Sequence, residues 1–123
     1  DLAGLPRPAY MEGRSLMPIL RGEADPNQFR EFVRCEYFDA LDPHFTGGSG
    51  TFATMYRDRR YKLSVYHDHG LGELYDLEAD PWEFEDLWDD PAHHETRSRL
   101  IRASFDAHVL LTTDVGSRRI APM

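Results

Sequence analysis

The sequence has 123 residues, with 14 Lys and Arg against 22 Asp and Glu, which gives a formal net charge of −8. This length fits one domain, and the 41% hydrophobic content is too high for a disordered chain. The acidic balance argues against a protein that binds nucleic-acid backbones, and no apolar run approaches the roughly 20 residues that span a bilayer. The one cysteine, Cys35, excludes an intrachain disulfide framework and a multi-cysteine zinc site.

Residues 1–28 are predicted to form an extended connector, because prolines and glycines interrupt them throughout. One short helix fits inside this connector, from a cap at Ser15 to a stop at Gly22, with Pro18 in its first turn. Asp1 is not followed by the basic and apolar regions of a signal peptide, so we expect the chain to begin in the middle of a longer protein. The absence of a visible targeting segment slightly favours a cytoplasmic location.

Four runs rich in aromatic and β-branched residues predict four strands, at residues 30–38, 51–57, 60–67 and 72–77. The turn between the second and third strands is expected at Asp58-Arg59. A long segment, 39–50, separates the first two strands, and the loop His67-Asp68-His69-Gly70 leads into the fourth. Strands that follow one another with such short connections favour an antiparallel sheet.

Two Asp-Pro pairs predict helix starts, because Asp caps the first turn and Pro presets its first dihedral angle. The pair Asp80-Pro81 is expected to begin a short helix, and Asp90-Pro91 a longer one that reaches residue 112. The expected apolar stripe of the short helix is Phe84, Leu87 and Trp88. The stripe of the long helix is Leu100, Ala103, Ala107 and Leu111, flanked by Ile101 and Phe105. The predicted class is α+β: a four-stranded antiparallel sheet packed against a C-terminal helix, with an extended N-terminal connector.

Three segments resemble one known family. Residues 73–87 read ELYDLEADPWEFEDL and resemble the ELYDL-x-x-DP-x-E-x-x-NL signature of the C-terminal subdomain of sulfatases, in the alkaline phosphatase superfamily. Tyr61-Lys62-Leu63 is similar to the strand that precedes this signature, and the stretches 2–6 and 13–20 resemble the family's connector. Asp86 departs from the pattern, which usually has Asn at that position.

This resemblance implies a subdomain at residues 29–113, a tail at 114–123, and an upstream catalytic domain as its partner. Sulfatases use a formylglycine made from a Cys/Ser-x-Pro-x-Arg motif and a calcium site, and both would lie in that catalytic domain. The 123 residues contain no such motif, and Cys35 is followed by Glu36 and Tyr37, so it is not the nucleophile precursor. We therefore assign no catalytic residue and no cofactor to this chain, and expect it to be inactive alone.

The two His residues of His67-Asp68-His69 could lie on one side of a strand end, as in some zinc sites, but a third ligand is not identifiable and no metal site is assigned. In an antiparallel meander the segment 39–50 and the loop 67–71 lie at the same end of the sheet. Asp42 and His44 can therefore join that cluster. The candidates for the rim of a substrate cleft are His44, His67, Asp68 and His69, because imidazole can donate hydrogen bonds to an anionic sulfate ester.

Other charged and glycine-rich patterns favour solvated structure. Gly47-Gly48-Ser49-Gly50 lacks the Lys-Ser/Thr ending of a phosphate-binding loop, and the basic residues at 57–62 are typical of an exposed hairpin turn. We expect no nucleic-acid or membrane partner.

The sequence thus predicts a non-catalytic sulfatase portion that packs on its catalytic domain and helps to shape the substrate cleft. The alternatives are the corresponding part of a phosphonate or phosphate monoester hydrolase, and a freestanding interaction or oligomerisation module. In isolation the chain is expected to form homo-oligomers, because its connector and one sheet face would expose apolar side chains.

Overall fold

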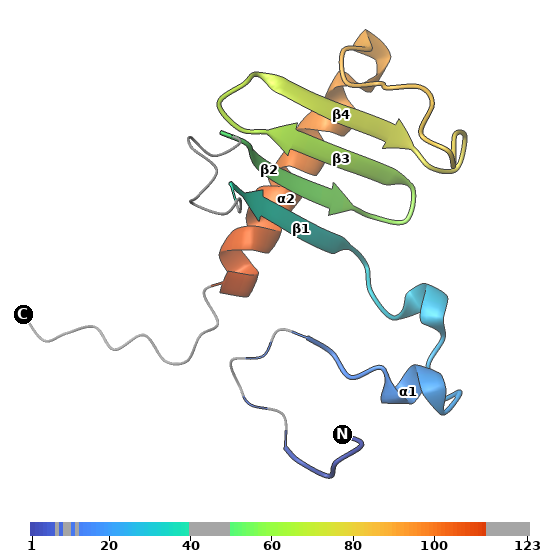
Figure 1. The fold of residues 1–123 in the computed structure, drawn as a ribbon. Coiled ribbons are helices and arrows are strands. Elements are labelled where there is room, and N and C mark those ends of the chain that lie inside the picture. Colours follow the sequence, from blue (N-terminus) through green and yellow to red (C-terminus); the bar gives the residue numbers. More distant parts are fainter. Residues whose placement is uncertain (7, 9–10, 12, 40–49, 113–123) are drawn as a thin grey trace, which may run out of the picture. The chain divides into compact units, whose positions relative to one another are not determined.

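The computed structural model describes residues 1–6, 8, 11, 13–39 and 50–112 (Figure 1). The chain divides into two compact units, Asp1–Arg30 with Phe105–Met123, and Glu31–Ser104. The expected tail at 114–123 and most of the segment 39–50 lie outside the described residues. No helix among the described residues is long and apolar enough to cross a membrane.

The connector holds two short helical turns, α1 (Met17–Leu20) and η1 (Pro26–Gln28). The expected short helix is confirmed as α1, where the Ser15 hydroxyl oxygen accepts a hydrogen bond from the backbone N–H of Met17 at 3.2 Å. η1 was not expected. It begins at Asp25-Pro26, and the Asp25 carboxylate accepts from the N–H of Asn27 at 2.8 Å, so it uses the same Asp-Pro cap that was assigned further along the chain.

The four predicted strands are confirmed, with bounds that differ from the predicted ones by one to three residues at most ends. They are β1 (Val33–Phe38), β2 (Phe52–Arg57), β3 (Tyr61–Tyr66) and β4 (Leu71–Asp76). The strands pair in chain order, each antiparallel to the next, as Figure 1 shows. The fold is therefore α+β, with a four-stranded antiparallel meander.

The hairpin between β2 and β3 turns one residue later than expected. Its last strand pair is Arg57 with Lys62, and the N–H of Asp58 donates to the carbonyl of Tyr61 at 3.0 Å, so Arg59 and Arg60 occupy the turn. Asp58 stabilises this turn from its first position, since its carboxylate accepts from the N–H groups of Arg60 and Tyr61 at 2.9 and 2.7 Å. An aspartate at this position commonly bonds the backbone two residues on.

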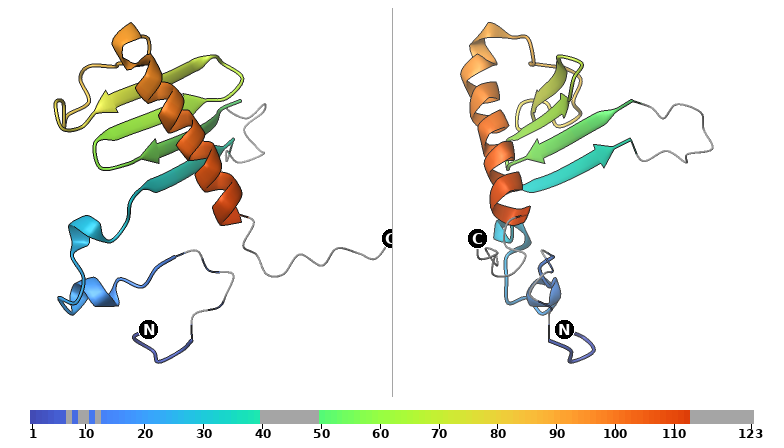
Figure 2. Two further views of the ribbon diagram at one scale, coloured as in Figure 1. Left: turned by 180° about the vertical axis from the view of Figure 1, so that it is seen from behind. Right: turned by 90° about the vertical axis from the view of Figure 1, so that its left-hand side faces the viewer.

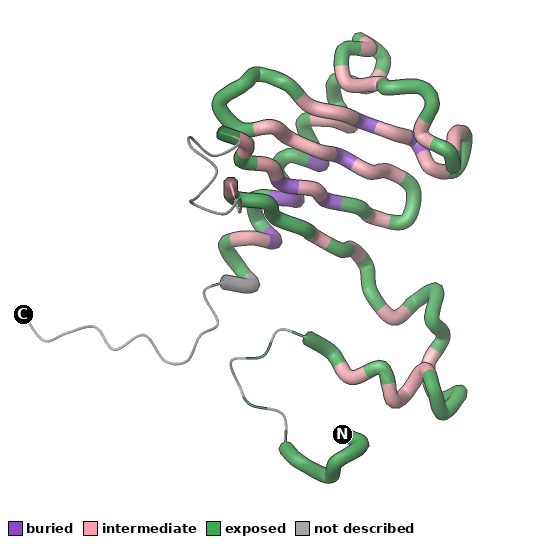
Figure 3. Tube along the Cα trace, viewed as in Figure 1, coloured by how far each residue is buried: buried purple, intermediate pink, exposed green. Residues whose placement is uncertain are grey.

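The core lies on one face of the sheet, where Tyr56, Leu63 and Leu74 form one row across β2, β3 and β4. The helix α2 (His94–Thr112) follows a short turn, η2 (Pro91–His93), which Asp90 caps by accepting from the N–H of Ala92. Figure 2 shows the first half of α2 running across this face, and Figure 3 shows that the buried residues gather there. Leu100, from α2, is fully buried.

The expected stripe of α2 needs a correction. Ser104 is buried one turn after Leu100, whereas Ala103 is only half-buried. Ala107 is buried as expected, Ile101 and Phe105 are exposed, and the side chain of Leu111 lies outside the described set. The stripe runs through positions 100, 104 and 107, so the spacing is helical, but one of its members is the polar residue Ser104, which an apolar pattern does not include.

The short helix expected at Asp80-Pro81 does not form, and residues 77–90 form turns and irregular structure instead. Phe84, assigned to its apolar stripe, is 88% exposed. The N–H of Leu87 donates to the carbonyl of Leu74 at 2.8 Å, which attaches this segment to the outer edge of β4. A helix this short is marginal by itself, so pairing with the sheet decides the conformation.

Candidate functional site

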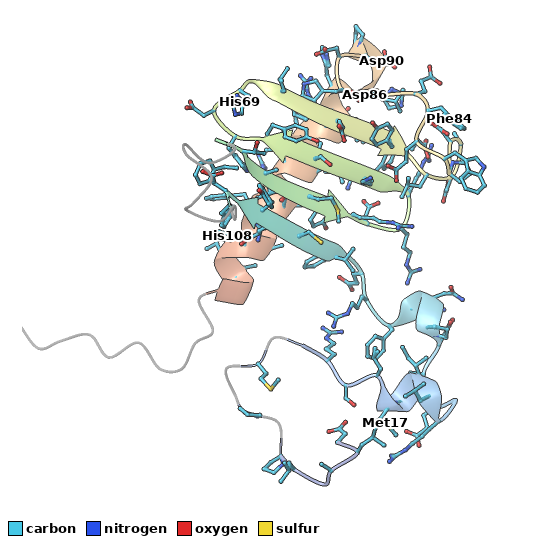
Figure 4. All side chains as sticks on the ribbon, viewed as in Figure 1. Met17, His69, Phe84, Asp86, Asp90 and His108 are labelled. Atoms are coloured by element: carbon cyan, nitrogen blue, oxygen red, sulfur yellow. The ribbon has the colours of Figure 1, made fainter. Side chains whose placement is uncertain are left out.

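The loop that carries three of the four candidate residues is the turn of residues 67–70 between β3 and β4 (Figure 4). Asp68 and Gly70 adopt left-handed backbone angles, with φ of +67° and +65°. His67 Nε2 lies 3.0 Å from the hydroxyl oxygen of Thr54, while His69 Nε2 lies 3.3 Å from the backbone oxygen of Gly50. The two imidazoles therefore have separate partners, although both lie at the same end of the sheet.

This end of the sheet also receives the segment between β1 and β2. The N–H of Asp39 donates to the carbonyl of Thr51 at 3.0 Å, which brings the two ends of that segment together beside the 67–70 loop. The fourth candidate, His44, lies outside the described residues, as does Asp42. Among the described residues no three His, Cys, Asp or Glu side chains are grouped so as to hold a metal ion.

At the start of the sulfatase-like signature, Asp76 is the buried carboxylate that anchors the following turn. Arg60 donates to it through Nε, at 3.1 and 3.0 Å, and through Nη2 at 2.7 Å. The N–H groups of Glu78 and Ala79 donate to the same carboxylate at 3.2 and 3.4 Å. These bonds, the Arg60 bond first, lower the pKa of Asp76 although burial acts in the opposite direction, and the bond between Arg60 and Asp76 raises the pKa of Arg60.

Asp86 occupies the position where the sulfatase pattern usually has Asn. Its Oδ1 accepts hydrogen bonds from the backbone N–H of Leu74 and of Trp88, both at 2.9 Å. The amide oxygen of an Asn could accept the same two bonds, so this departure changes the charge and keeps the hydrogen bonding. The signature therefore fixes the 77–88 loop against β4 at both of its ends.

Trp88 completes this attachment on the face that carries the core. A Cβ added to Gly72 would lie 2.2 Å from its ring, so β4 needs a glycine at this point. Arg97, from α2, lies over the same ring at 4.8 Å and donates to the backbone oxygen of Trp88. The loop, the sheet and the helix thus meet at one indole ring.

The opposite face of the sheet, which we call the open face, carries polar and aromatic side chains. A shallow hollow of about 140 Å³ lies on it. Tyr66 beside the hollow donates its hydroxyl to Glu73 at 3.1 Å, and burial with this bond raises the pKa of Tyr66. At the far end Lys62 forms an ion pair with Glu83 and lies 5.6 Å from the Tyr75 ring centre. The hollow is lined by Cys35, Glu36, Tyr37, Ala53, Thr54, Met55, Ser64 and Tyr66.

The sequence identifies the signature but not the partners of its members. Arg60 lies sixteen residues before Asp76, and its place among the basic residues 57–62 predicts a solvated turn. The same pattern predicts an exposed Lys62, yet Lys62 reaches Glu83, twenty-one residues later. The only signal was the resemblance itself, because the spacing along the chain does not show which charges meet.

The comparison with protein families identifies residues 1–107 with the family described as N-sulphoglucosamine sulphohydrolase, C-terminal. A Delta 4,5-hexuronate-2-O-sulfatase of Bacteroides thetaiotaomicron is 33% identical over 114 residues. The match covers 93% of this chain and 22% of that protein. The chain therefore spans less than a quarter of this curated relative's length.

Solved structures agree with this relationship. A 2-O GAG sulfatase is 31% identical, with a TM-score of 0.72, over 93% of this chain and 23% of that one. A phosphonate monoester hydrolase from Silicibacter pomeroyi is 27% identical, with a TM-score of 0.69, over 92% of this chain and 24% of that one. From the matched residues, the antiparallel sheet and these relatives, the chain belongs to the N-sulphoglucosamine sulphohydrolase C-terminal family, as a C-terminal sulfatase subdomain of the alkaline phosphatase superfamily.

Proposed function

We propose that this chain serves as the non-catalytic C-terminal part of a sulfatase and packs on a catalytic domain through its open face. The match to the family model over residues 1–107 carries the proposal, because the sulfatase relatives are more than four times as long as the part they share. Exposed apolar side chains on the open face support the packing surface, with Val33 and Tyr37 about two-fifths exposed.

The cofactors that the family implies do not fit the residues described here. A calcium site needs several oxygen ligands, and the described residues hold no group of three acidic, His or Cys side chains. The full sequence also has no Cys/Ser-x-Pro-x-Arg motif from which a formylglycine could form. We therefore assign calcium and formylglycine to the catalytic domain and derive no reaction step from this chain.

The residues through which this chain would contribute to substrate recognition lie at the end of the sheet that holds the 67–70 loop. His67, Asp68 and His69 are exposed there, and His44 belongs to the segment that enters the same end. Imidazole N–H groups can donate to the oxygens of an anionic sulfate ester. The relative named as a hexuronate-2-O-sulfatase makes a sulfated sugar the first substrate class to test.

A second function in the same superfamily has its own support. The structural likeness to a phosphonate monoester hydrolase is nearly as close as that to the sulfatase, with TM-scores of 0.69 and 0.72. The C-terminal part alone does not distinguish a sulfatase from a phosphonate monoester hydrolase, since both kinds of enzyme act on anionic esters. A freestanding interaction module is the third alternative.

The test has two arms. The gene upstream of Asp1 is read for a Cys/Ser-x-Pro-x-Arg motif, which a sulfatase requires and a freestanding module lacks. The 123-residue chain is assayed with an aryl sulfate, an aryl phosphate and an aryl phosphonate ester, with calcium added, and we expect no turnover. Turnover that disappears when a residue within this chain is replaced would disprove the non-catalytic assignment.

A further inference from the structure

The two edge strands of the sheet, β4 and β1, differ in what lies along their outer sides. Two outward carbonyls of β4 accept hydrogen bonds from its own chain, since the N–H of Leu87 donates to Leu74 and the N–H of Asp80 donates to Asp76. β1 lies at the other edge, and among the strands that the structure describes it has a neighbour on the β2 side only. It pairs with β2 over six residues in one continuous register. It contains neither Pro nor Lys, and its two charged side chains, Arg34 and Glu36, are of opposite sign.

The direction of the backbone groups along β1 follows from its pairing. The N–H of Asp39 donates toward β2, and in an antiparallel ladder this direction alternates from residue to residue. Val33, Cys35 and Tyr37 therefore direct their backbone groups toward β2. The intervening residues Arg34 and Glu36 direct theirs to the outer side.

The side chains of these outward residues carry alternating charge. Arg34 and Glu36 form an ion pair on the face of the sheet that also carries Tyr56. The side chain of Arg34 is only 14% exposed. Its Nε is buried and has no acceptor among the described residues, so this guanidinium has a donor to spare.

We propose that β1 pairs antiparallel with β1 of a second copy, about a two-fold axis at Cys35. In this register Arg34 of each copy lies opposite Glu36 of the other, and Val33 lies opposite Tyr37. The existing Arg34–Glu36 pair is kept, and the second copy brings a further carboxylate close to each guanidinium. The contact is self-complementary, as two-fold interfaces are, and it joins two four-stranded sheets into one of eight strands.

Charge selects this register over its neighbours. A two-fold axis at Glu36 would set Glu36 against itself, and an axis at Arg34 would set Arg34 against itself. Like charges directly opposite one another across two strands are destabilising. The net charge of −8 on each copy opposes association, but salt at 0.15 M screens exposed charges beyond about 8 Å.

The charge pairing is tested by sedimentation velocity of the full chain in 0.15 M salt, with Arg34→Glu and Glu36→Arg measured alone and mixed. Alone, each variant sets like charges opposite one another, and we expect self-association to weaken on the order of tenfold. In an equimolar mixture the introduced carboxylate faces the introduced guanidinium, so dimers return. If the two residues served only their own chain, mixing would restore nothing, and that result would overturn the proposal.

The register is tested on the wild-type chain, so it does not depend on a variant that folds. Diamide takes two electrons and two protons from a pair of thiols, and the narrow pairing at Cys35 should let the two copies form a disulfide at once. The control is Cys35→Ser with Tyr37→Cys, whose thiols would face Val33 of the other copy and should cross-link at least tenfold more slowly. Equal rates, or a single 14.2 kDa species at high micromolar concentration, would refute the edge pairing.

Discussion

The guanidinium of Arg60 binds the carboxylate of Asp76 on the outer strand β4, with Nη2 2.7 Å from Oδ2. This contact joins the turn after β2 to the end of β4, where Asp76, the aspartate of the ELYDL signature, is buried. The Asp76 side chain is 7% exposed, while that of Arg60 is 51% exposed. The pair is therefore a partly buried one, whose loss leaves a carboxylate without its main donor.

Arg60→Ala should lower the free energy of unfolding, because it leaves the buried Asp76 carboxylate without its main hydrogen-bond donor, although the water-facing part of the pair reduces the loss. Arg59→Ala is the matched control, since Arg59 is exposed in the same turn and should change stability by less than about 0.5 kcal/mol. Urea melts measure both. Equal effects from the two variants would contradict the role given to Arg60.

Acid should destabilise the fold through Asp76. Its pKa is lowered in the folded chain, so its contribution is fully present above the ordinary value of 3.8 and is lost as the pH falls below it. Asp76→Asn should be less stable than the wild type at neutral pH, and the two should converge as the pH falls. Asp90, whose pKa is lowered mainly by the N–H of Ala92, should keep some acid sensitivity in the variant. Melts from pH 6 to 2 follow the difference.

Asp86→Asn should leave the stability within about 0.5 kcal/mol, because the amide oxygen can accept the bonds from Leu74 and Trp88. Asp86→Ala removes the acceptor and should cost about 1–2 kcal/mol. Thermal unfolding of the three chains separates these effects. A large loss in the Asn variant would show that the negative charge, and not the hydrogen bonding, holds the loop.

Gly72→Ala should destabilise by about 1–3 kcal/mol, because the added methyl group would lie 2.2 Å from the Trp88 ring. Gly13→Ala is the control, since a Cβ there meets nothing within 4 Å. Adding Trp88→Leu to Gly72→Ala should recover part of the loss if the clash is its cause. No recovery in chemical denaturation would point to a backbone effect at Gly72 instead.

The strands and α2 could be predicted from the sequence because their signals are local. Alternation of aromatic and β-branched residues marks β2 and β3, and the Asp90-Pro91 cap marks the turn into α2. The same cap at Asp80-Pro81 predicts a helix that does not form, because pairing with the distant strand β4 decides the conformation of the residues after it. Leu74 offers its backbone to Leu87, and that pairing along β4 has no trace in the spacing of the signature.

The candidate rim could be predicted only as far as topology allows. Alternate loops of a meander share an end, and the contact of His69 with Gly50 agrees with that rule. The directions of the two imidazoles depend on which side of the strand each residue lies. The direction of the His67 imidazole is determined by its contact with Thr54 on β2, and the sequence pattern around positions 67–69 contains no information about this contact.

The two tryptophans of the 77–88 loop report on different events, because their surroundings differ. Trp82 is 78% exposed, whereas Trp88 lies between Gly72 and the guanidinium of Arg97. The fluorescence of Trp82 should be quenched readily by iodide, and its emission should shift to the blue when another surface covers the loop. The fluorescence of Trp88 should change only when the sheet unfolds. Replacing either one with phenylalanine leaves a single tryptophan: Trp82 then reports docking, and Trp88 reports unfolding.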